Sequence, residues 1–268
     1  MVKKRIIFAL LYKDGYFHLS RNFRLQKVGD ANWLIDNFGF GETCNFIDEL
    51  VCLLVKNNPT KLEKQDFLNQ INQIRKKIFI PITIGGGIKS INDAKIYFQN
   101  GADKILINTK TSDTKLLKNI ANFWGNQAIT IMIDYQKNLK KIDIFVNCGL
   151  KKLSNLDEYK KNILSKISFG EIILNSIDRD GNGSGLDLEI CKQFSNNFKS
   201  PILLMGGAGK PEHIFEALKI KNVSGVVTAN LFNFLGSGLE KSRLNSIKKN
   251  INLAKFDNKI MLWFIFDI

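Results

Sequence analysis

Two similar strand ends carry the clearest chemical difference in this chain. One predicted strand ends in Ile133-Asp134-Tyr135 and another in Leu10-Leu11-Tyr12, so the same position holds a carboxyl group in one and an apolar side chain in the other. A carboxyl group at a strand end can act as a general acid or base. Asp134 is therefore a candidate for acid–base chemistry. Leu11 cannot carry a proton, and Asp14 lies too far along the next loop to replace it.

Two glycine clusters indicate anion binding. Gly85-Gly86-Gly87 and Gly206-Gly207-Ala208-Gly209 each follow a predicted strand and precede a helix start. Bare backbone N–H groups can surround a phosphate there, where a side chain would exclude it. Polar strand ends follow one unit later, at Asn108-Thr109 and Ala229-Asn230. Glycines that only make tight strand-to-helix turns would give the same pattern, so both explanations stay open.

The elements that must position these residues are short β-branched runs alternating with longer helical patterns, which is typical of βα units. The predicted strands are Arg5–Leu11, Glu49–Val55, Ile80–Ile84, Lys104–Asn108, Ala128–Asp134, Glu171–Ser176, Pro201–Met205 and Gly225–Ala229. The predicted helices are Leu62–Lys77, Asn92–Gln99, Thr114–Phe123, Glu158–Ile167, Leu188–Phe198 and Glu212–Ile220. Eight units in 268 residues predict a TIM (β/α)8 barrel. The insert Lys140–Asn147 is predicted as the extra strand of a hairpin.

The two halves of the chain resemble each other. Pro81–Gly87 aligns with Pro201–Gly207 at an offset of 201 − 81 = 120 residues, and Leu11 aligns with Asp134. This similarity predicts two half-barrels with equivalent ligand sites at the carboxyl ends of the strands. We expect one barrel domain over residues 1–250, followed by an apolar tail of unknown role over 251–268.

Composition limits the possible partners. The formal net charge of +14 favours an anionic substrate or partner, although lysine is abundant throughout and general composition would also explain it. Basic residues are not interleaved with exposed aromatics as in nucleic-acid grooves, so no nucleic acid is expected. The four cysteines are widely spaced and the chain has two histidines, which argues against disulfides and a zinc site. We expect no cofactor, no metal, no membrane span and a cytoplasmic location.

A third glycine-rich stretch, Ser176-Ile177-Asp178-Arg179-Asp180-Gly181, is the most specific motif. Together with four further motifs in the same order, it makes the chain resemble the cyclase subunit of imidazole glycerol phosphate synthase over nearly its full length. Those motifs are Lys4-Arg5-Ile6-Ile7, Gly85-Gly86-Gly87-Ile88, Gly101-Ala102-Asp103-Lys104 and Gly206-Gly207-Ala208-Gly209-Lys210. The resemblance implies a barrel that receives ammonia from a glutaminase subunit at its bottom. At its top, that family cyclises a doubly phosphorylated ribulosyl nucleotide.

The resemblance also implies roles for individual residues. Phosphate would bind at Gly87, Asn108 and Thr109 in one half, and at Asp180, Gly181, Gly207, Ala229 and Asn230 in the other. An ammonia gate would consist of Arg5, Glu49, Lys104 and Glu171, each of which opens a predicted strand. Four such charges of alternating sign inside a barrel must pair, although a structural plug or solvated strand ends would also explain them. Asp103 would contact the glutaminase.

The family's two catalytic aspartates correspond to Leu11 and Asp134, and a further family aspartate corresponds to Leu54. The leading hypothesis is a divergent paralogue that accepts ammonia but delivers it to other chemistry. The segment Ser20–Asp30 is similar to members found with sugar amidotransferases in surface-polysaccharide biosynthesis, where ammonia forms an acetamidino group on an amino sugar. Two alternatives stay open: an ordinary cyclase subunit of histidine biosynthesis, with Lys13 or water replacing the missing acid, and a non-catalytic activator of the glutaminase.

Overall fold

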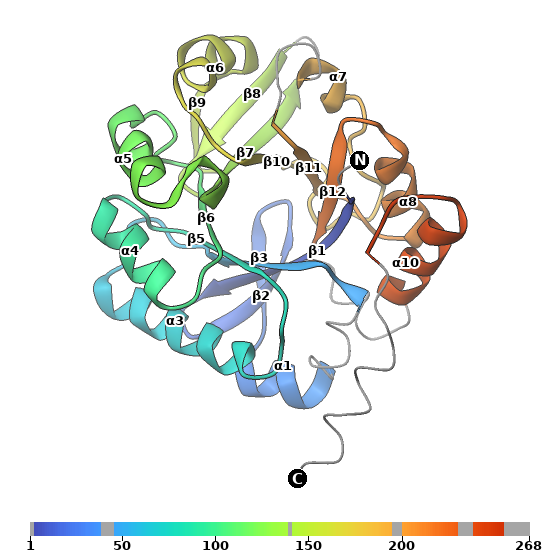
Figure 1. Ribbon diagram of the computed structural model, residues 1–268, viewed down its shortest axis with the longest axis horizontal. Coiled ribbons are helices and arrows are strands. Elements are labelled where there is room, and N and C mark those ends of the chain that lie inside the picture. Colours follow the sequence, from blue (N-terminus) through green and yellow to red (C-terminus); the bar gives the residue numbers. More distant parts are fainter. Residues whose placement is uncertain (1–2, 39–45, 139–140, 195–199, 230–237, 255–268) are drawn as a thin grey trace.

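The computed structural model describes residues 3–38, 46–138, 141–194, 200–229 and 238–254. In these residues, eight parallel strands close into a barrel, because each pairs with the next and the last pairs with the first (Figure 1). In order around the barrel they are β1 (Arg5–Lys13), β4 (Glu49–Leu54), β5 (Ile82–Gly85), β6 (Lys104–Ile107), β7 (Ile129–Asn138), β10 (Glu171–Ser176), β11 (Ile202–Met205) and β12 (Val223–Thr228). The predicted TIM barrel is confirmed.

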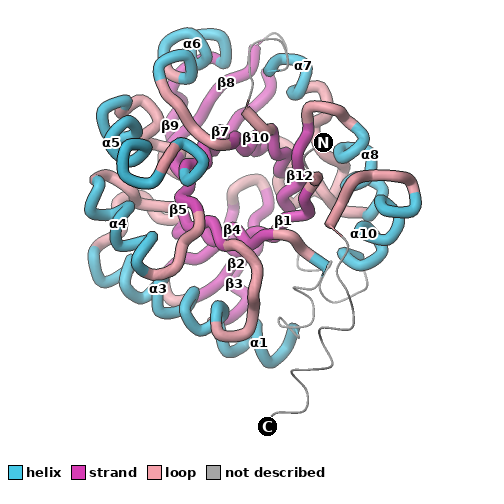
Figure 2. Tube along the Cα trace, in the orientation of Figure 1, coloured by secondary structure: helices cyan, strands magenta, loops and turns pink. Residues whose placement is uncertain are grey.

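Helices form an outer ring around the strands (Figure 2). They are α1 (Ala31–Phe38), α3 (Lys61–Arg75), α4 (Ile91–Gln99), α5 (Thr114–Trp124), α6 (Leu156–Asn162), α7 (Ile190–Phe194), α8 (Pro211–Lys219) and α10 (Gly238–Lys248). Side-chain caps explain where several of them begin: Ser90 and Asp93 form a capping box for α4, and Thr60 and Glu63 form one for α3. The helix predicted over Glu158–Ile167 is shorter than expected, because α6 ends at Asn162 and a 3₁₀ turn follows.

Each half-barrel extends its first strand into an antiparallel hairpin. After β7 come β8 (Lys141–Val146) and β9 (Lys151–Asn155), which confirms the extra strand predicted in the insert. After β1 come β2 (Tyr16–Arg21) and β3 (Arg24–Gly29). The sequence analysis predicted no strand in this second hairpin, and it also missed β9, α1 and α10.

Two apolar layers follow from the alternation of side chains along the strands. Ile7, Ala9 and Leu11 on β1 belong to the cluster inside the barrel. Ile6, Phe8 and Leu10 on the same strand belong to the larger cluster between the strands and the helices. Leu11 therefore points into the barrel from the position predicted for it.

No helix in the described ranges is long and apolar enough to cross a membrane. The described residues also contain no group of three or more histidine, cysteine, aspartate or glutamate side chains that could hold a metal ion. Of the predicted tail, only residues 251–254 are described; Leu253 forms an isolated parallel bridge with Lys4.

Candidate active site

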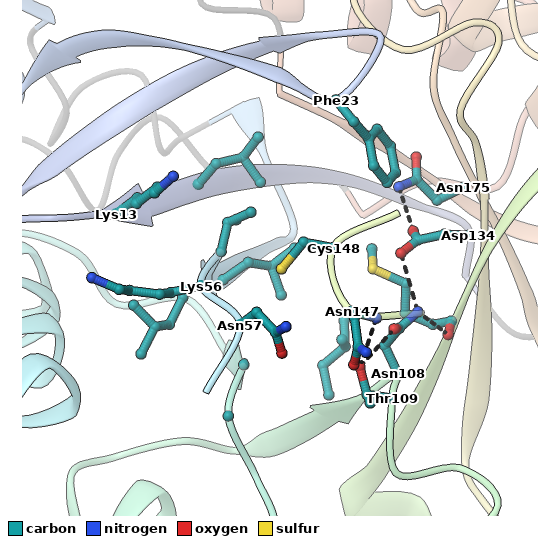
Figure 3. A pocket seen from close by; sticks show the side chains of 18 of the residues that line it. Lys13, Phe23, Lys56, Asn57, Asn108, Thr109, Asp134, Asn147, Cys148 and Asn175 are labelled. Atoms are coloured by element: carbon teal, nitrogen blue, oxygen red, sulfur yellow. Dashed lines mark hydrogen bonds between the residues drawn. The ribbon is translucent and has the colours of Figure 1, made fainter. Parts of the chain in front are cut away.

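A cavity of about 760 Å³ opens at the carboxyl ends of the barrel strands. Its described lining includes four of the predicted phosphate ligands (Gly87, Asn108, Thr109 and Asp180) and the predicted catalytic Asp134. Figure 3 shows Asp134 on one side of the cavity, with Lys13 and Lys56 on the other. This is the face at which barrel enzymes of this fold place their chemistry, so the cavity is the candidate active site.

Asp134 is buried beneath the cavity and held by two amides. The Nδ2 of Asn175 on β10 donates to its Oδ1 at 2.8 Å, and the Nδ2 of Asn108, directly after β6, donates to its Oδ2 at 3.1 Å. Burial raises the pKa of Asp134 to about 7, with a smaller contribution from the negative charge of Asp180, while the two amide hydrogen bonds oppose the shift. A carboxyl group with that pKa can both donate and accept a proton near neutral pH.

The cavity wall opposite Asp134 is apolar where the resemblance places the second catalytic aspartate. Leu11 is only 6% exposed and packs in the inner cluster, with Leu25 of β3 against it. Leu54 also borders the cavity, but it packs in the outer apolar cluster. Asp14 lies in the exposed β1–β2 turn, where its carboxylate pairs with Lys56 at 2.6 Å. No carboxylate in the described lining therefore faces Asp134 from β1 or β4.

The first glycine cluster borders the cavity together with cationic side chains. Gly86 and Gly87 follow β5 with positive φ angles of 104° and 67°. A side chain at Gly86 would collide with the Leu54 carbonyl, so this glycine is required by the packing of the loop alone. Lys56, Lys89 and Lys110 also line this wall. Lys56 is paired with Asp14 and Glu63, and Lys110 is paired with Asp113. Lys89 contacts the neutral side chain of Asn58, so its charge suits a phosphate.

The second glycine cluster is packed against its own neighbours. A side chain at Gly207 would collide with the Gly185 carbonyl, and the Gly209 amide donates to Nδ1 of His213 at 3.2 Å. Gly181, Gly207 and Ala229 are not in the described lining of the cavity. Asn230 lies outside the described residues. The two predicted phosphate sites thus differ: Gly87, Asn108 and Thr109 of the first all line the described cavity, whereas of the second only Asp180 does.

Asp180 ties the β2–β3 hairpin to the loop after β10. Its Oδ2 accepts hydrogen bonds from Ser20 Oγ at 2.5 Å and from the Phe23 backbone N–H at 2.9 Å, and its carbonyl accepts from the Asn22 N–H at 2.9 Å. A side chain at Gly181 would collide with the Ser20 carbonyl. These contacts place the hairpin tip over the cavity, which Ser20 and Phe23 help to line.

The four predicted gate residues form a closed ring of ion pairs inside the barrel, here called the charge ring. Arg5 contacts Glu49 at 2.8 Å and Glu171 at 2.5 Å, and Lys104 contacts the same two carboxylates at 2.7 and 2.5 Å. Burial opposes the charge of Glu171, but Lys104 and Arg5 outweigh it and hold the pKa of that carboxyl below its usual range. Each acid also accepts a hydrogen bond from a buried threonine, Thr83 for Glu49 and Thr130 for Glu171.

The outer face around the amino ends of the strands carries exposed aromatic side chains. Phe79, in the segment before β5, is 91% exposed, and Phe123, in the last turn of α5 before β7, is 71% exposed. Asp103 is exposed at the start of β6, where its carboxylate accepts a hydrogen bond from the Ile82 N–H at 2.7 Å.

Asn175 was missed by the sequence analysis, although it binds Asp134 directly. One signal pointed to it: Glu171 was assigned to the barrel interior, and residues two and four positions further along a strand share that face. Cys148 was also missed. It lines the cavity from the β8–β9 turn, and burial raises its thiol pKa, but its position depends on the hairpin geometry, which the sequence did not predict.

Comparison with known proteins gives consistent matches. The family model described as "Histidine biosynthesis protein" matches residues 47–236. A protein of Parasynechococcus marenigrum (strain WH8102), provisionally named imidazole glycerol phosphate synthase subunit hisF2, is 41% identical over 258 residues, which cover 96% of this chain and 95% of that protein. The imidazole glycerol phosphate synthase subunits HisF of Chlorobium phaeobacteroides (strain BS1) and Clostridium botulinum (strain 657 / Type Ba4) are 32% and 33% identical; the matches cover 87% and 93% of this chain and 92% and 97% of those subunits.

Proposed function

This chain belongs to the histidine biosynthesis protein family, with relatives that are HisF subunits of imidazole glycerol phosphate synthase, and from that premise we propose that it receives ammonia from a glutaminase partner and passes it to an acceptor. The partner would dock at the amino ends of the strands, around Asp103. Ammonia would pass the charge ring and reach the cavity through the barrel. The protein would thus be one subunit of a glutamine-dependent synthase.

The observation that carries this proposal is the buried charge ring on the same axis as the cavity. Removing two acids and two bases from water is costly unless every charge is paired, and here each contacts two of opposite sign. Above the ring the barrel interior is apolar, with Ile7, Val51 and Ile173 among its side chains. Transfer into such a region costs a small neutral molecule less than an ion, which would lose its hydration without compensation.

The acceptor in this proposal differs from the family's ribulosyl nucleotide, because acid–base chemistry across the cavity has one carboxyl group instead of two. Asp134 provides a titratable group on one side, and Leu11 provides none on the other. We propose that the acceptor is an amino sugar of a surface polysaccharide, in which ammonia forms an acetamidino group together with a sugar amidotransferase. Lys89, beside the first glycine cluster in the cavity lining, would bind the phosphate of a nucleotide-linked or otherwise phosphorylated ligand.

Cyclase activity tests the first part of this proposal. The purified protein is combined with its glutaminase and the doubly phosphorylated histidine-pathway intermediate, and formation of the imidazole product is followed. We expect glutamine hydrolysis with little cyclisation. Cyclisation at the rate of an ordinary HisF subunit would reject a changed acceptor. An absence of glutaminase binding would reject ammonia transfer itself.

The second candidate is an ordinary cyclase subunit of histidine biosynthesis. It is favoured by the retained Asp134, whose pKa of about 7 suits proton transfer, and by the first glycine cluster beside Asn108 and Thr109. In that case another group must act opposite Asp134. Lys13 lines the cavity on the far side from Asp134 in Figure 3, so Lys13 and water are both candidates for that place.

A further inference from the structure

We propose that Asn175 is the residue that receives ammonia at the top of the barrel, with its side-chain oxygen accepting a hydrogen bond from the ammonia N–H beside Asp134. This inference rests on the proposed function, since it names the binding partner of ammonia within the same site. Asn175 acts here as a positioning residue: it would hold the nitrogen so that its lone pair faces the acceptor in the cavity.

The side-chain oxygen of Asn175 is the first reason to place ammonia at this residue. Asn175 is 5% exposed and lines the cavity. Its Nδ2 donates to Asp134 Oδ1 at 2.8 Å, which fixes the orientation of the amide. Among the residues that the structure describes, its Oδ1 has no hydrogen-bond partner. Buried polar atoms in native proteins are nearly always satisfied, so a ligand N–H or O–H at this place would complete the site.

The other side-chain amide that binds Asp134, that of Asn108, provides a comparison. Asn108 makes the equivalent contact, Nδ2 to Asp134 Oδ2 at 3.1 Å. Its own side-chain oxygen already accepts from Thr109 Oγ1 at 3.3 Å. The two asparagines therefore hold the same carboxyl group, but among the described residues the Asn175 oxygen is the one of the two that is buried without a hydrogen-bond partner.

Asn175 also lies above the charge ring, on the same strand as Glu171. Strands β7 and β10 run side by side with Thr130 opposite Glu171 and Asp134 opposite Asn175. Between these polar pairs, the inward side chains are Met132 and Ile173. At about 3.3 Å per residue, Asn175 lies roughly 13 Å beyond Glu171. Neutral ammonia that crosses this apolar stretch along β10 meets Asn175 as the first hydrogen-bond acceptor of that strand.

Side-chain NMR of the full-length protein tests this assignment. The protein carries ¹⁵N in its asparagine amides and ¹³C in its aspartate carboxyl groups, and it is titrated with ammonium chloride in alkaline buffer, where much of the salt is free ammonia. We expect saturable shifts of the Asn175 amide and the Asp134 carboxyl carbon. Potassium chloride at the same ionic strength, or ammonium chloride in acidic buffer, should give neither.

Variants of Asn175 separate its hydrogen bond to ammonia from an effect of its packing alone. Asn175→Leu removes the acceptor, and Asn175→Ala does so with a smaller change in volume; both should raise the ammonia concentration for a half-maximal Asp134 shift at least tenfold. Asn69→Ala, at an exposed position of α3, is the control and should keep the response within about twofold. An unchanged response in the folded Asn175→Ala variant, or no saturable response in the wild type, would overturn the assignment.

Failure of this inference can be told apart from failure of the proposed function. If the glutaminase binds and hydrolyses glutamine while the wild-type barrel shows no ammonia response, only the role of Asn175 is rejected. If no glutaminase associates, ammonia transfer between subunits is rejected. The titration with ammonium chloride still decides the role of Asn175 in that case, because it needs no partner.

Discussion

At the scale of single residues, Asp134 combines deep burial with hydrogen bonds that suit a carboxylate. Asn175 and Asn108 each donate to one of its oxygens, yet burial raises its pKa to about 7. An unfolded aspartate has a pKa of about 3.9. Between these values the folded protein binds a proton that the unfolded chain lacks, so stability falls as pH rises through this window.

Asp134→Asn removes this dependence. Three pKa units correspond to roughly 4 kcal/mol, so the variant's free energy of unfolding should gain about that much relative to wild type between pH ~4 and pH ~8. Urea unfolding at both pH values measures it. Asp36→Asn, at an exposed position of α1, is the control and should differ from wild type by less than about 0.5 kcal/mol at either pH. The same difference in free energy of unfolding between Asp134→Asn and wild type at both pH values would contradict the raised pKa.

Leu11→Asp tests whether the cavity has only lost an acid. General acid–base catalysis contributes roughly 10²–10⁴ in rate. If the ancestral reaction were intact except for that group, cyclisation of the histidine-pathway intermediate should rise by at least about 100-fold. The proposed change of acceptor predicts no gain beyond about twofold over Leu11→Asn, which adds a polar group without a titratable proton. Product formation per enzyme, measured for both variants, decides between them.

At the scale of elements, the sequence predicted the barrel because eight short β-branched runs alternate with longer helical patterns. Arg5, Glu49, Lys104 and Glu171 each open a strand as predicted. The β2–β3 hairpin was not predicted, because its charged and polar residues alternate weakly and β3 is mostly exposed. The similarity between the half-barrels was a usable signal: a hairpin was predicted after the strand of Asp134, and the aligned strand of Leu11 has one too.

The charge ring predicts that the protein loses stability when one of the ring's carboxylates is removed. Glu171→Gln leaves Arg5 and Lys104 each with one carboxylate fewer, and a broken buried ion pair costs about 3–5 kcal/mol. Urea unfolding should show this loss, while Glu189→Gln, from the exposed pair Lys192–Glu189, should change stability by less than about 0.5 kcal/mol.

The same ring has a predictable pH dependence. Because the cations depress the pKa of Glu171, its stabilising contribution is present above the pKa of the unfolded chain. It is lost as pH falls through the folded pKa. Equal stability of wild type and Glu171→Gln at neutral pH would contradict a strongly paired ring.

At the scale of the whole molecule, the barrel has two ends with different surfaces. The cavity and its lysines lie at the carboxyl ends of the strands, whereas Phe79, Phe123 and Asp103 lie at the amino ends. The charge ring and the apolar interior lie between them. This arrangement suits a protein that takes a small molecule from one partner and uses it at the opposite face.

Phe123→Ala tests the docking face. Truncating an aromatic side chain at the centre of an interface commonly costs more than about 1 kcal/mol, so affinity for the glutaminase should fall roughly tenfold. Leu62→Ala, in the first turn of α3 where Leu62 is 83% exposed, serves as the control and should leave affinity unchanged. Calorimetric titration measures both, and equal affinities would place the partner elsewhere.

The central claim is that ammonia crosses this barrel to an acceptor other than the ribulosyl nucleotide, and a single isotope experiment tests it. The protein, its glutaminase and the sugar amidotransferase receive ATP, which activates the amide oxygen of the sugar as a leaving group, and glutamine labelled with ¹⁵N in the side-chain amide. The acetylated amino sugar and the histidine-pathway intermediate are both present. The account predicts ¹⁵N in the acetamidino group of the sugar, and loss of that label when the barrel is omitted. Appearance of the ¹⁵N in the imidazole product instead would contradict it.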